Sequence, residues 1–356
     1  MKTLIWFPVL MVAGLVAWMA WAGQLARPSV VSQTSSAGRE HPPGFPMYSK
    51  AGYDITPLPK ARIAEIAKTL TPEQERVTLH ADTERPFCTA MHKNKGAGTY
   101  VSVVGGLPLF KSTGKFDSGT GWPSFFEPIS PDHIVERSDG TLGMKRTEIL
   151  DARSGAHLGH VFDDGPPPTG KRYCVNSASL KFIPEGTPLP PESQPVKAQV
   201  AYFAGGCFWG VEDVFEQIPG VIDAESGYQG GKTANPTYEQ VSSHDTGHAE
   251  SVKVTFDPAR VSYRALLKVF FDNHDPTTLD RQGPDVGSNY RSAIFASTPA
   301  QQSEAADFIA ELSKTPRFKT AKIVTTVQPA APFYRAEEYH QNYHAIHGGS
   351  CQVKVR

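Results

Sequence analysis

The stretch Gly205-Gly206-Cys207-Phe208-Trp209-Gly210 decides how the C-terminal half of this 356-residue chain is interpreted. An apolar run at residues 199–204 precedes it, and an amphipathic run follows it as far as Gly220. This order predicts a strand that passes through the glycines into a helix, with Cys207 at the helix N-terminus. Unpaired N–H groups and the helix dipole favour a thiolate there, and the thiolate is the nucleophilic form of cysteine. A cysteine that only packs in a core helix would not need Gly-Gly before it and Trp after it, so we expect a reactive thiol.

Outward from this stretch, strands and helices alternate along the C-terminal half. Apolar patterns predict helices at residues 261–273 and 299–314 and further strands at 221–228, 250–256, 292–295 and 322–327. The alternation predicts an α/β two-layer sandwich with mixed connections. The tail at 332–356 is polar and aromatic, and we predict no regular element in it.

The N-terminal half has a different pattern. A helical pattern covers about 61–70, and Thr71-Pro72-Glu73-Gln74 has the form of a helix start with a capping box. Short β-like runs follow at 99–104, 133–137, 143–150, 156–162 and 175–182. Gly and Pro separate these runs at short intervals, so we expect a mostly antiparallel sheet domain.

Two polar segments divide the chain. The proline-rich stretch at 185–196 predicts a linker without regular structure, between an N-domain at 46–184 and a C-domain at 197–356. Residues 1–22 contain an apolar run from Leu4 to Ala22 that ends in Ala20-Trp21-Ala22, the form of a signal-peptidase site. Cleaved or retained as a membrane anchor, this segment predicts export, and residues 23–45 read as a flexible tether.

The composition excludes several classes of protein. The net charge is −1, and acids and bases are interspersed, so no basic stripe indicates binding to nucleic acid. The four cysteines are too few for a disulfide scaffold, and two domains of this size can each bury a core.

A second cysteine lies in chemically suggestive surroundings. Cys174 lies in Arg172-Tyr173-Cys174-Val175-Asn176, fourteen residues after His160 in His157-Leu158-Gly159-His160. A cysteine near an arginine and two histidines in one β domain is a candidate low-pKa nucleophile. The two histidines are three residues apart and cannot alternate onto one strand face, so a bulge or turn must bring them together. Each histidine alone reads equally well as an ordinary surface or core residue.

Further motifs follow Cys207 in a fixed order: Asn235-Pro236-Thr237-Tyr238, Thr246-Gly247-His248-Ala249-Glu250 and Asp285-Val286-Gly287-Ser288-Asn289-Tyr290-Arg291-Ser292. Together with the Cys207 stretch they resemble methionine sulfoxide reductase A over residues 199–356. The resemblance implies that Cys207 attacks the sulfoxide sulfur and that Glu250 protonates the sulfoxide oxygen. Such an acid is needed because the oxygen leaves as water, and an apolar pocket lets a glutamic acid keep its proton.

The same resemblance implies supporting roles around Cys207. Tyr238 and Tyr290 would donate hydrogen bonds to the sulfoxide oxygen, and Asp285 would help to orient the site. Phe208 and Trp209 would hold the S-methyl group. Without the resemblance, both tyrosines read equally well as packing residues.

In the N-domain, Phe116-Asp117-Ser118-Gly119-Thr120-Gly121-Trp122-Pro123-Ser124-Phe125 precedes the histidine and Cys174 motifs. This set resembles methionine sulfoxide reductase B over about 60–184, a reductase of the opposite sulfoxide epimer with an unrelated fold. The resemblance implies that Cys174 is the nucleophile and that Arg172, with Asp164 nearby, lowers the pKa of the Cys174 thiol. It also implies that three polar residues handle the sulfoxide oxygen, namely His157, His160 and Asn176. Trp122 would receive the methyl group.

The chain departs from the B-type pattern at two places. Where many relatives have the four cysteines of a structural zinc site, this chain has Ser102, Gly105, Asp151 and Ser154, so we expect no zinc and no other metal. The usual second cysteine is replaced by Thr120. Cys88 is the only other cysteine in that domain and is our candidate resolving thiol.

In the C-domain, Cys351 in the Gly-rich tail is the candidate resolving thiol, because a sulfenic acid condenses with a second thiol to a disulfide. Some relatives have a further cysteine where this chain has Ser242, so we expect the relay to stop at one disulfide. The chain contains no Cys-x-x-Cys of its own, so an external thioredoxin-like dithiol must close each cycle.

The sequence therefore predicts a bifunctional enzyme that reduces both epimers of methionine sulfoxide, free and in proteins. An exported enzyme of this kind would repair oxidised proteins outside the cytoplasm. A different class remains open: a secreted binding module with structural bridges Cys88–Cys174 and Cys207–Cys351. A Cys174–His160 hydrolase lacks an oxyanion-hole signature, and a metal site built on His157 and His160 lacks the further ligands it needs.

Overall fold

The computed structural model describes residues 45–89, 91–140 and 146–349. The apolar segment at 1–22, residues 23–44 of the predicted tether and the candidate resolving residue Cys351 therefore lie outside the described residues. Among the helices that are described, none combines the length and the apolar character needed to cross a bilayer. The two domains are described one at a time.

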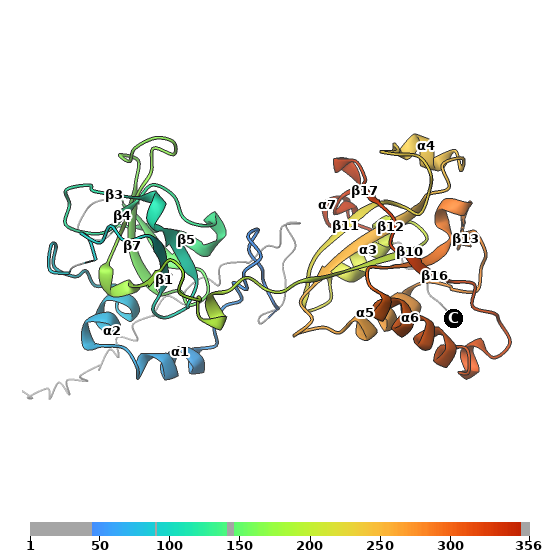
Figure 1. Ribbon diagram of the computed structural model, residues 1–356, viewed down its shortest axis with the longest axis horizontal. Helices are drawn as coiled ribbons and strands as arrows, with labels where there is room; N and C mark the ends of the chain where they lie inside the picture. Colours follow the sequence, from blue (N-terminus) through green and yellow to red (C-terminus); the bar gives the residue numbers. More distant parts are fainter. Residues whose placement is uncertain (1–44, 90, 141–145, 350–356) are drawn as a thin grey trace, which may run out of the picture. The chain divides into compact units, whose positions relative to one another are not determined.

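The N-domain is built from two antiparallel sheets and two short helices (Figure 1). The helices are α1 (Lys60–Ala67) and α2 (Pro72–Leu79). One sheet has the order β2-β1-β9, formed by β1 (Gly98–Ser102), β2 (Pro108–Lys111) and β9 (Leu180–Pro184). The other has the order β3-β4-β8-β7-β6-β5, formed by β3 (Lys115–Phe116), β4 (Ser124–Phe125), β5 (Ile134–Asp139), β6 (Arg146–Asp151), β7 (His157–Phe162) and β8 (Arg172–Val175). The expected antiparallel β domain is confirmed.

Local sequence signals in this domain have mixed outcomes. The predicted helix start is confirmed, because the Thr71 hydroxyl accepts the Gln74 N–H and the Gln74 side chain accepts the Thr71 N–H. The single strand predicted at 175–182 is wrong. It divides into β8, a one-turn 3₁₀ helix at Ser177–Ser179 and β9, and β8 and β9 belong to different sheets. The chain turns sharply after Cys174 because it has to change sheets.

The linker is more ordered than its composition predicts. Residues 191–193 form a one-turn 3₁₀ helix, so the expectation of no regular element there is wrong. The Ser193 hydroxyl donates to the Gly106 carbonyl at 2.5 Å, and the Arg153 guanidinium donates to the Glu192 carbonyl at 2.8 Å. Proline at the start of such a turn costs nothing, because its missing N–H has no partner there in any case.

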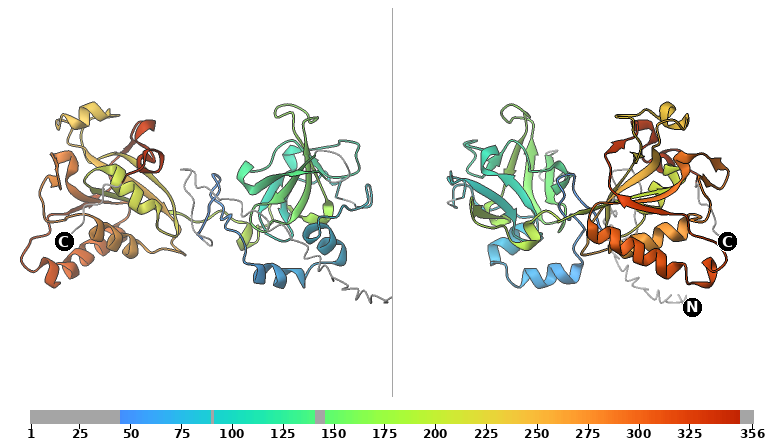
Figure 2. Two further views of the ribbon diagram at one scale, coloured as in Figure 1. Left: turned by 180° about the vertical axis from the view of Figure 1, so that it is seen from behind. Right: turned by 45° about the vertical axis from the view of Figure 1, so that its right-hand side comes forward.

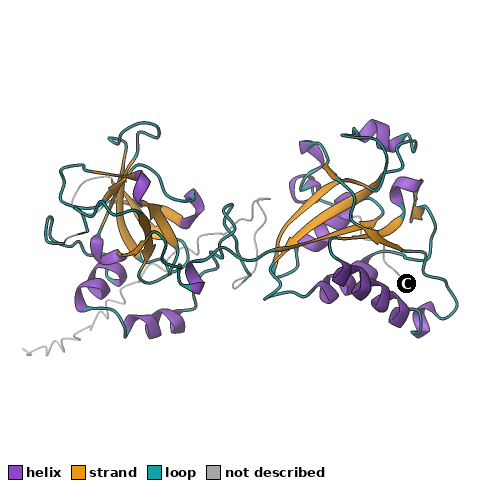
Figure 3. Cartoon of the chain, in the orientation of Figure 1, coloured by secondary structure: helices purple, strands orange, loops and turns teal. Residues whose placement is uncertain are grey.

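The C-domain has a six-stranded sheet with the order β16-β15-β10-β12-β11-β17. Figure 3 draws its strands in orange. Its strands are β10 (Gln199–Gly205), β11 (Val221–Gln229), β12 (Ala249–Phe256), β15 (Ser292–Ala296), β16 (Thr326–Pro329) and β17 (Phe333–Arg335). Only the β15–β16 pair of this sheet is parallel. A separate hairpin joins β13 (Arg281–Gln282) to β14 (Asp285–Val286).

Helices α3 (Phe208–Glu216), α5 (Tyr263–Asn273) and α6 (Pro299–Leu312) pack on this sheet, and α5 lies beside α6 (Figure 2). Alternate residues of β10 point to opposite faces. Phe203 is fully buried in the core with α3 and α5 and stacks on Phe215 at a ring distance of 4.7 Å, whereas Ala204 belongs to a separate cluster. The strand alternation therefore decides which face of β10 receives the helices.

Helices α4 (Tyr238–Ser242) and α7 (Tyr343–His347) are short. The prediction that the tail after residue 332 has no element is wrong, because β17 and α7 both lie in it. The segment 333–335 is short and partly buried, and it pairs with β11. Tertiary contacts, and not the local propensity of the sequence, therefore make it a strand.

Candidate active sites

Cys207 is the N-cap residue of α3, directly after β10, as the sequence predicts. Its carbonyl accepts the Gly210 N–H at 3.2 Å, which begins the helix. Gly206 before it has φ of +100°, and a Cβ at that position would lie 2.5 Å from the Gln282 side chain. The second glycine is therefore required both by the backbone conformation and by the close approach of β13.

Glu250 lies beside the start of α3 and is 2% exposed. Its carboxylate accepts the Phe208 N–H at 3.1 Å and the Asn289 side-chain N–H at 3.4 Å. Burial raises the pKa of Glu250 to about 7 and outweighs these two hydrogen bonds, which lower it. The structure thus places a carboxylic acid with a pKa of about 7 next to the residue that follows Cys207.

Tyr238 begins α4, and Tyr290 ends a one-turn 3₁₀ helix at Ser288–Tyr290. Burial is the main reason that the pKa of each is raised, and the neighbouring charge of Glu250 raises both further. Burial also raises the pKa of Asp285, whose charge acts on Glu250. These mutual effects show that the residues predicted from motifs far apart in the sequence come together around Glu250.

An aromatic wall surrounds the start of α3. Phe208 is buried, and Trp209 stacks on Tyr343 with parallel rings 3.7 Å apart. The Trp209 indole N–H donates to Nδ1 of His340 at 3.1 Å, and the His340 ring lies 5.0 Å from the Phe208 ring. Sequence reasoning missed His340 and Tyr343, because it assigned no structure to the tail that contains them.

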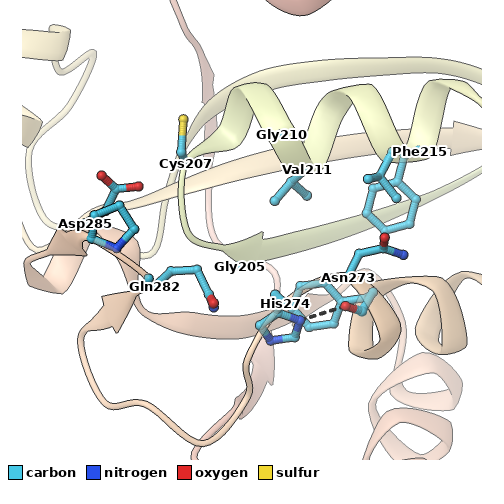
Figure 4. A pocket seen from close by; sticks show the side chains of 13 residues that line it. Gly205, Cys207, Gly210, Val211, Phe215, Asn273, His274, Gln282 and Asp285 are labelled. Atoms are coloured by element: carbon cyan, nitrogen blue, oxygen red, sulfur yellow. Dashed lines mark hydrogen bonds between the residues drawn. The ribbon is translucent and has the colours of Figure 1, made fainter. Parts of the chain in front are cut away.

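A pocket of about 320 Å³ lies beside Cys207, between α3, α5 and the β13–β14 hairpin. In Figure 4 the Asp285 carboxylate lies on the Cys207 side of this pocket, whereas His274 and Asn273 lie on its far side. Asp285 and Cys207 thus line the same pocket.

In the N-domain, Cys174 lies on β8 between Ser124 of β4 and His160 of β7, its partners in register. The Thr120 hydroxyl is 4.0 Å from its sulfur, so Thr120 faces Cys174. Burial raises the pKa of the Cys174 thiol, and Arg172 lowers it by a smaller amount. The expected direction of the Arg172 effect is present, but burial outweighs it.

The Arg172 guanidinium is held by Asp164 through two hydrogen bonds of 2.8 Å and lies 4.3 Å above the Phe162 ring. Asp164 thus acts on the arginine, and the paired charges keep Arg172 against the sheet. A bidentate pair of this kind fixes the direction of the guanidinium plane.

His157 and His160 lie close together, with ring centres 5.6 Å apart. The predicted irregularity is confirmed: the β6–β7 register shifts so that Gly159 pairs with Ile149 and His157 with Leu150. Gly159 has φ of +154°, and a Cβ there would lie 2.0 Å from the Cys174 carbonyl.

Each histidine has a carboxylate partner that sequence reasoning missed. His157 Nδ1 is 2.7 Å from Glu148, and His160 Nε2 is 2.8 Å from Asp139. The sequence does contain acidic residues on the neighbouring hairpin. Only the register between β5, β6 and β7 shows which of these carboxylates faces which histidine.

Trp122 and Asn176 are both bonded to the backbone. The Trp122 indole N–H donates to the Glu84 carbonyl at 3.2 Å. The buried Asn176 amide donates to the Leu158 carbonyl at 3.1 Å and accepts the Glu84 N–H at 3.1 Å. A direct contact between Asn176 and a sulfoxide oxygen stays a prediction.

Cys88 is exposed, and both Cys88 and Cys174 are free thiols. The bridge Cys88–Cys174 that a disulfide-stapled binding module requires is therefore absent. Its second bridge involves Cys351, outside the described residues.

The four positions that correspond to the zinc ligands of many B-type relatives converge in this chain on a carboxylate. Fully buried Asp151 accepts hydrogen bonds from the Ser102 hydroxyl at 2.6 Å and the Ser154 hydroxyl at 2.7 Å. A Cβ on Gly105 would lie 1.9 Å from the same carboxylate. Among the residues that the structure describes, no group of three or more His, Cys, Asp or Glu side chains has a geometry suited to a metal.

Comparisons with known proteins agree with this division into two sites. The family model of peptide methionine sulfoxide reductase matches residues 199–356, and that of the SelR domain matches residues 70–184. A peptide methionine sulfoxide reductase MsrA of Methanoculleus marisnigri is 54% identical over 149 residues, which cover 42% of this chain and 90% of that protein. A peptide methionine sulfoxide reductase MsrB of Xylella fastidiosa is 53% identical over 138 residues, which cover 39% of this chain and 89% of that protein.

The fold and the two cysteine sites thus define a two-domain chain of the thiol-dependent reductase class. More particularly, the chain belongs to the peptide methionine sulfoxide reductase family, with an MsrB-type domain followed by an MsrA-type domain.

Proposed function

We propose that this chain reduces both epimers of methionine sulfoxide, the S epimer in the C-domain and the R epimer in the N-domain. The observation that supports the chemistry best is buried Glu250, whose raised pKa of about 7 lies beside the helix start that contains Cys207. The C-domain is a two-layer α/β sandwich in this proposal, supported by the core that joins α3 and α5 to one face of the sheet.

In each domain a cysteine thiolate attacks the sulfoxide sulfur and forms a bond between the two sulfurs, while the sulfoxide oxygen takes up a proton. The resulting hydroxyl group then passes from the methionine sulfur to the cysteine sulfur, and the bond between the two sulfurs breaks. The products are methionine and a cysteine sulfenic acid. A second thiol then attacks the sulfenic sulfur, which releases water and forms a disulfide. An external dithiol reduces that disulfide by two electrons, so that the cycle balances.

Glu250 supplies the proton in the C-domain, while Tyr238 and Tyr290 donate hydrogen bonds to the departing oxygen. Phe208 and Trp209 form the wall for the S-methyl group. In the N-domain, His157, His160 and Asn176 handle the oxygen, Arg172 stabilises the Cys174 thiolate, and Trp122 faces the methyl group. Each domain acts on free methionine sulfoxide and on methionine sulfoxide residues in oxidised proteins.

Separated epimers of a methionine sulfoxide peptide test this division, with dithiothreitol as the reductant. Cys207→Ser is expected to consume only the R epimer, and Cys174→Ser only the S epimer. Consumption of both epimers by either variant would mean that the chemistry is wrongly divided between the two cysteines. Failure of the unaltered chain on both epimers would reject the function.

Cys88 and Cys351 act as the resolving thiols in this proposal. For Cys88 the support is its exposure and its place next to Phe87, which bonds to the Gly121 carbonyl beside Trp122. Mass spectrometry after one equivalent of R sulfoxide is expected to show a Cys88–Cys174 disulfide. Cys88→Ser is expected to keep dithiothreitol-driven turnover and to lose turnover with a thioredoxin-like donor, and unchanged turnover with that donor would exclude the role.

The N-domain operates without zinc in this proposal, because serine, glycine and aspartate at the four positions do not form a thiolate site and Asp151 already bonds to Ser102 and Ser154. Metal analysis of the purified chain is expected to find far less than one zinc ion per chain. Incubation with a chelator is expected to leave R-epimer turnover unchanged.

Residues 1–22 direct export in this proposal, supported by their apolar sequence and the Ala20-Trp21-Ala22 pattern. The chain then acts outside the cytoplasm on oxidised exported proteins. Cell fractionation tests the location, and N-terminal sequencing of the mature chain distinguishes a cleaved signal from a retained anchor.

A further inference from the structure

Glu84 is a buried charged residue that none of the catalytic roles above uses. It lies in the loop between α2 and β1 and is 2% exposed. A carboxylate out of contact with water is costly unless hydrogen bonds replace its hydration. Its partners therefore show what the structure gains from placing it there.

The carboxylate of Glu84 receives two backbone N–H groups from the segment that follows Cys174. Ser177 N donates to Oε1 at 2.7 Å, and Ala178 N donates to Oε2 at 2.8 Å. These residues begin the one-turn 3₁₀ helix by which the chain leaves β8 for β9. Both carboxylate oxygens thus hold the turn that ends the catalytic strand.

The backbone of the same residue bonds to two other parts of the site. Its N–H donates to the Asn176 side chain at 3.1 Å, and its carbonyl accepts the Trp122 indole N–H at 3.2 Å. One residue therefore connects the strand that contains the nucleophile to the aromatic side chain expected to receive the methyl group.

The segment after Glu84 is held on the same wall. Phe87 N donates to the Gly121 carbonyl at 2.9 Å. The Phe87 ring packs so closely on Gly121 that a Cβ added to this glycine would lie only 2.7 Å from the ring. Phe87 has φ of +61°, a conformation that non-glycine residues adopt at a cost. Bonds at both ends thus fasten residues 84–87 to the Trp122 loop and to the Cys174 strand.

We infer that Glu84 is a positioning residue for the reduction of methionine R-sulfoxide: it sets the gap between Trp122 and Cys174 by bonding to both sides of the site. This inference rests on the proposed function of the N-domain. Displacement of a reacting group by about 1 Å costs on the order of 100-fold in rate. A side chain that never touches substrate can therefore control turnover.

Glu84→Gln tests the inference, because it keeps the shape of the side chain but turns one acceptor into an N–H₂ group that faces a backbone N–H. We expect kcat/KM for the R epimer to fall by about 10-fold or more. Alkylation of Cys174 by iodoacetamide, measured with the other three cysteines replaced by serine, needs no aromatic wall and is expected to change by less than about twofold. S-epimer turnover of the same preparation controls for concentration, and exposed Glu75→Gln is the matched control variant.

A double-mutant cycle with Trp122→Phe, which removes the indole N–H and keeps an aromatic ring, measures whether Glu84 acts through Trp122. We expect the two losses in kcat/KM to be clearly less than multiplicative, because both variants disturb the same gap. Multiplicative losses would overturn the inference, and so would R-epimer turnover within twofold of the unaltered chain. Turnover and Cys174 alkylation that fall together would show a merely structural role and would equally overturn it.

If Glu84→Gln does not fold, Glu84→Asp takes its place in the cycle, because it keeps both acceptor oxygens and the charge on a shorter side chain. Failure of the proposed function itself would appear separately, as an unaltered chain that leaves the R epimer intact.

Discussion

Burial gives Glu250 a property that its residue type does not have in water. A protein interior disfavours the carboxylate, so the pKa of Glu250 rises to about 7 even though two N–H groups bond to it. The proton-donating form of an acid is lost as the pH rises through its pKa. The C-domain therefore has an acid that is half protonated close to neutral pH, where an exposed glutamate would already be ionised.

We expect S-epimer turnover to decline above about pH 7, because the protonated form of Glu250 disappears there. Glu250→Gln is expected to lower kcat by about 100-fold or more and to abolish this decline. Rates for the separated S epimer between pH 5 and 9 check both, with R-epimer turnover of the same variant as the control. A decline that persists in the variant would assign it to another group.

Cys174 shows the opposite balance, because burial opposes the thiolate that the reaction needs and Arg172 favours it. Arg172→Leu is expected to shift the pH midpoint of Cys174 alkylation upward, because the thiolate loses a neighbouring positive charge. The measurement uses a chain in which Cys174 is the only cysteine. Lys171→Leu is the control, since Lys171 pairs with exposed Asp163. An unchanged midpoint in Arg172→Leu would show that Arg172 does not act on the thiol.

At the scale of elements, buried side chains connect loops and strands whose own sequences are unremarkable. Asp151, the last residue of β6, bonds to hydroxyl groups on β1 and on the β6–β7 turn, and it also accepts the Arg153 N–H at 2.9 Å. It thus joins the two turns where relatives of the B type have their zinc ligands. A hydrogen-bonded carboxylate can perform this connection without a metal.

Asp151→Ala is expected to destabilise the N-domain by about 3 kcal/mol, because it removes three hydrogen bonds to a buried charge and leaves their donors without partners. The loss of R-epimer turnover with increasing urea measures this, while S-epimer turnover reports on the C-domain in the same sample. Asp163→Ala, at an exposed position, is expected to leave the midpoint unchanged. Equal midpoints for Asp151→Ala and the unaltered chain would contradict the prediction.

At the scale of the whole molecule, each catalytic site has its own hydrophobic core. The core that includes Phe203 draws on residues 201–336, and the core that includes Phe110 draws on residues 55–180. None of the described residues belongs to both cores. Each core therefore supports one cysteine site and one epimer in the function proposed here.

We expect Phe203→Ala to lower the stability of the C-domain by about 3–5 kcal/mol and to leave R-epimer turnover unaffected. Phe110→Ala, which removes a ring stacked on Phe125 at 4.3 Å, is expected to do the reverse. Turnover of each epimer after incubation at increasing temperature checks both variants. Parallel loss of the two activities in either variant would show that the domains unfold as one unit.

The sequence by itself predicted two domains, the start of a helix at Cys207, and Cys174 and Cys207 as candidate nucleophiles. It did so because β10, the glycines and Cys207 are adjacent in the chain, and because several short motifs follow in a fixed order. The capping box at Thr71 and the irregularity between His157 and His160 were equally predictable, since both depend on neighbouring residues.

Only the tertiary structure decided which distant residues face each other. His340 comes to Trp209, Glu148 and Asp139 come to the two histidines, and Glu84 comes to Trp122 because sheet register and chain reversal bring them together. Burial, which sets the pKa of Glu250 and Cys174, depends on every neighbouring element at once. A sequence motif specifies local conformation, whereas long-range packing decides where a side chain points and how much water reaches it.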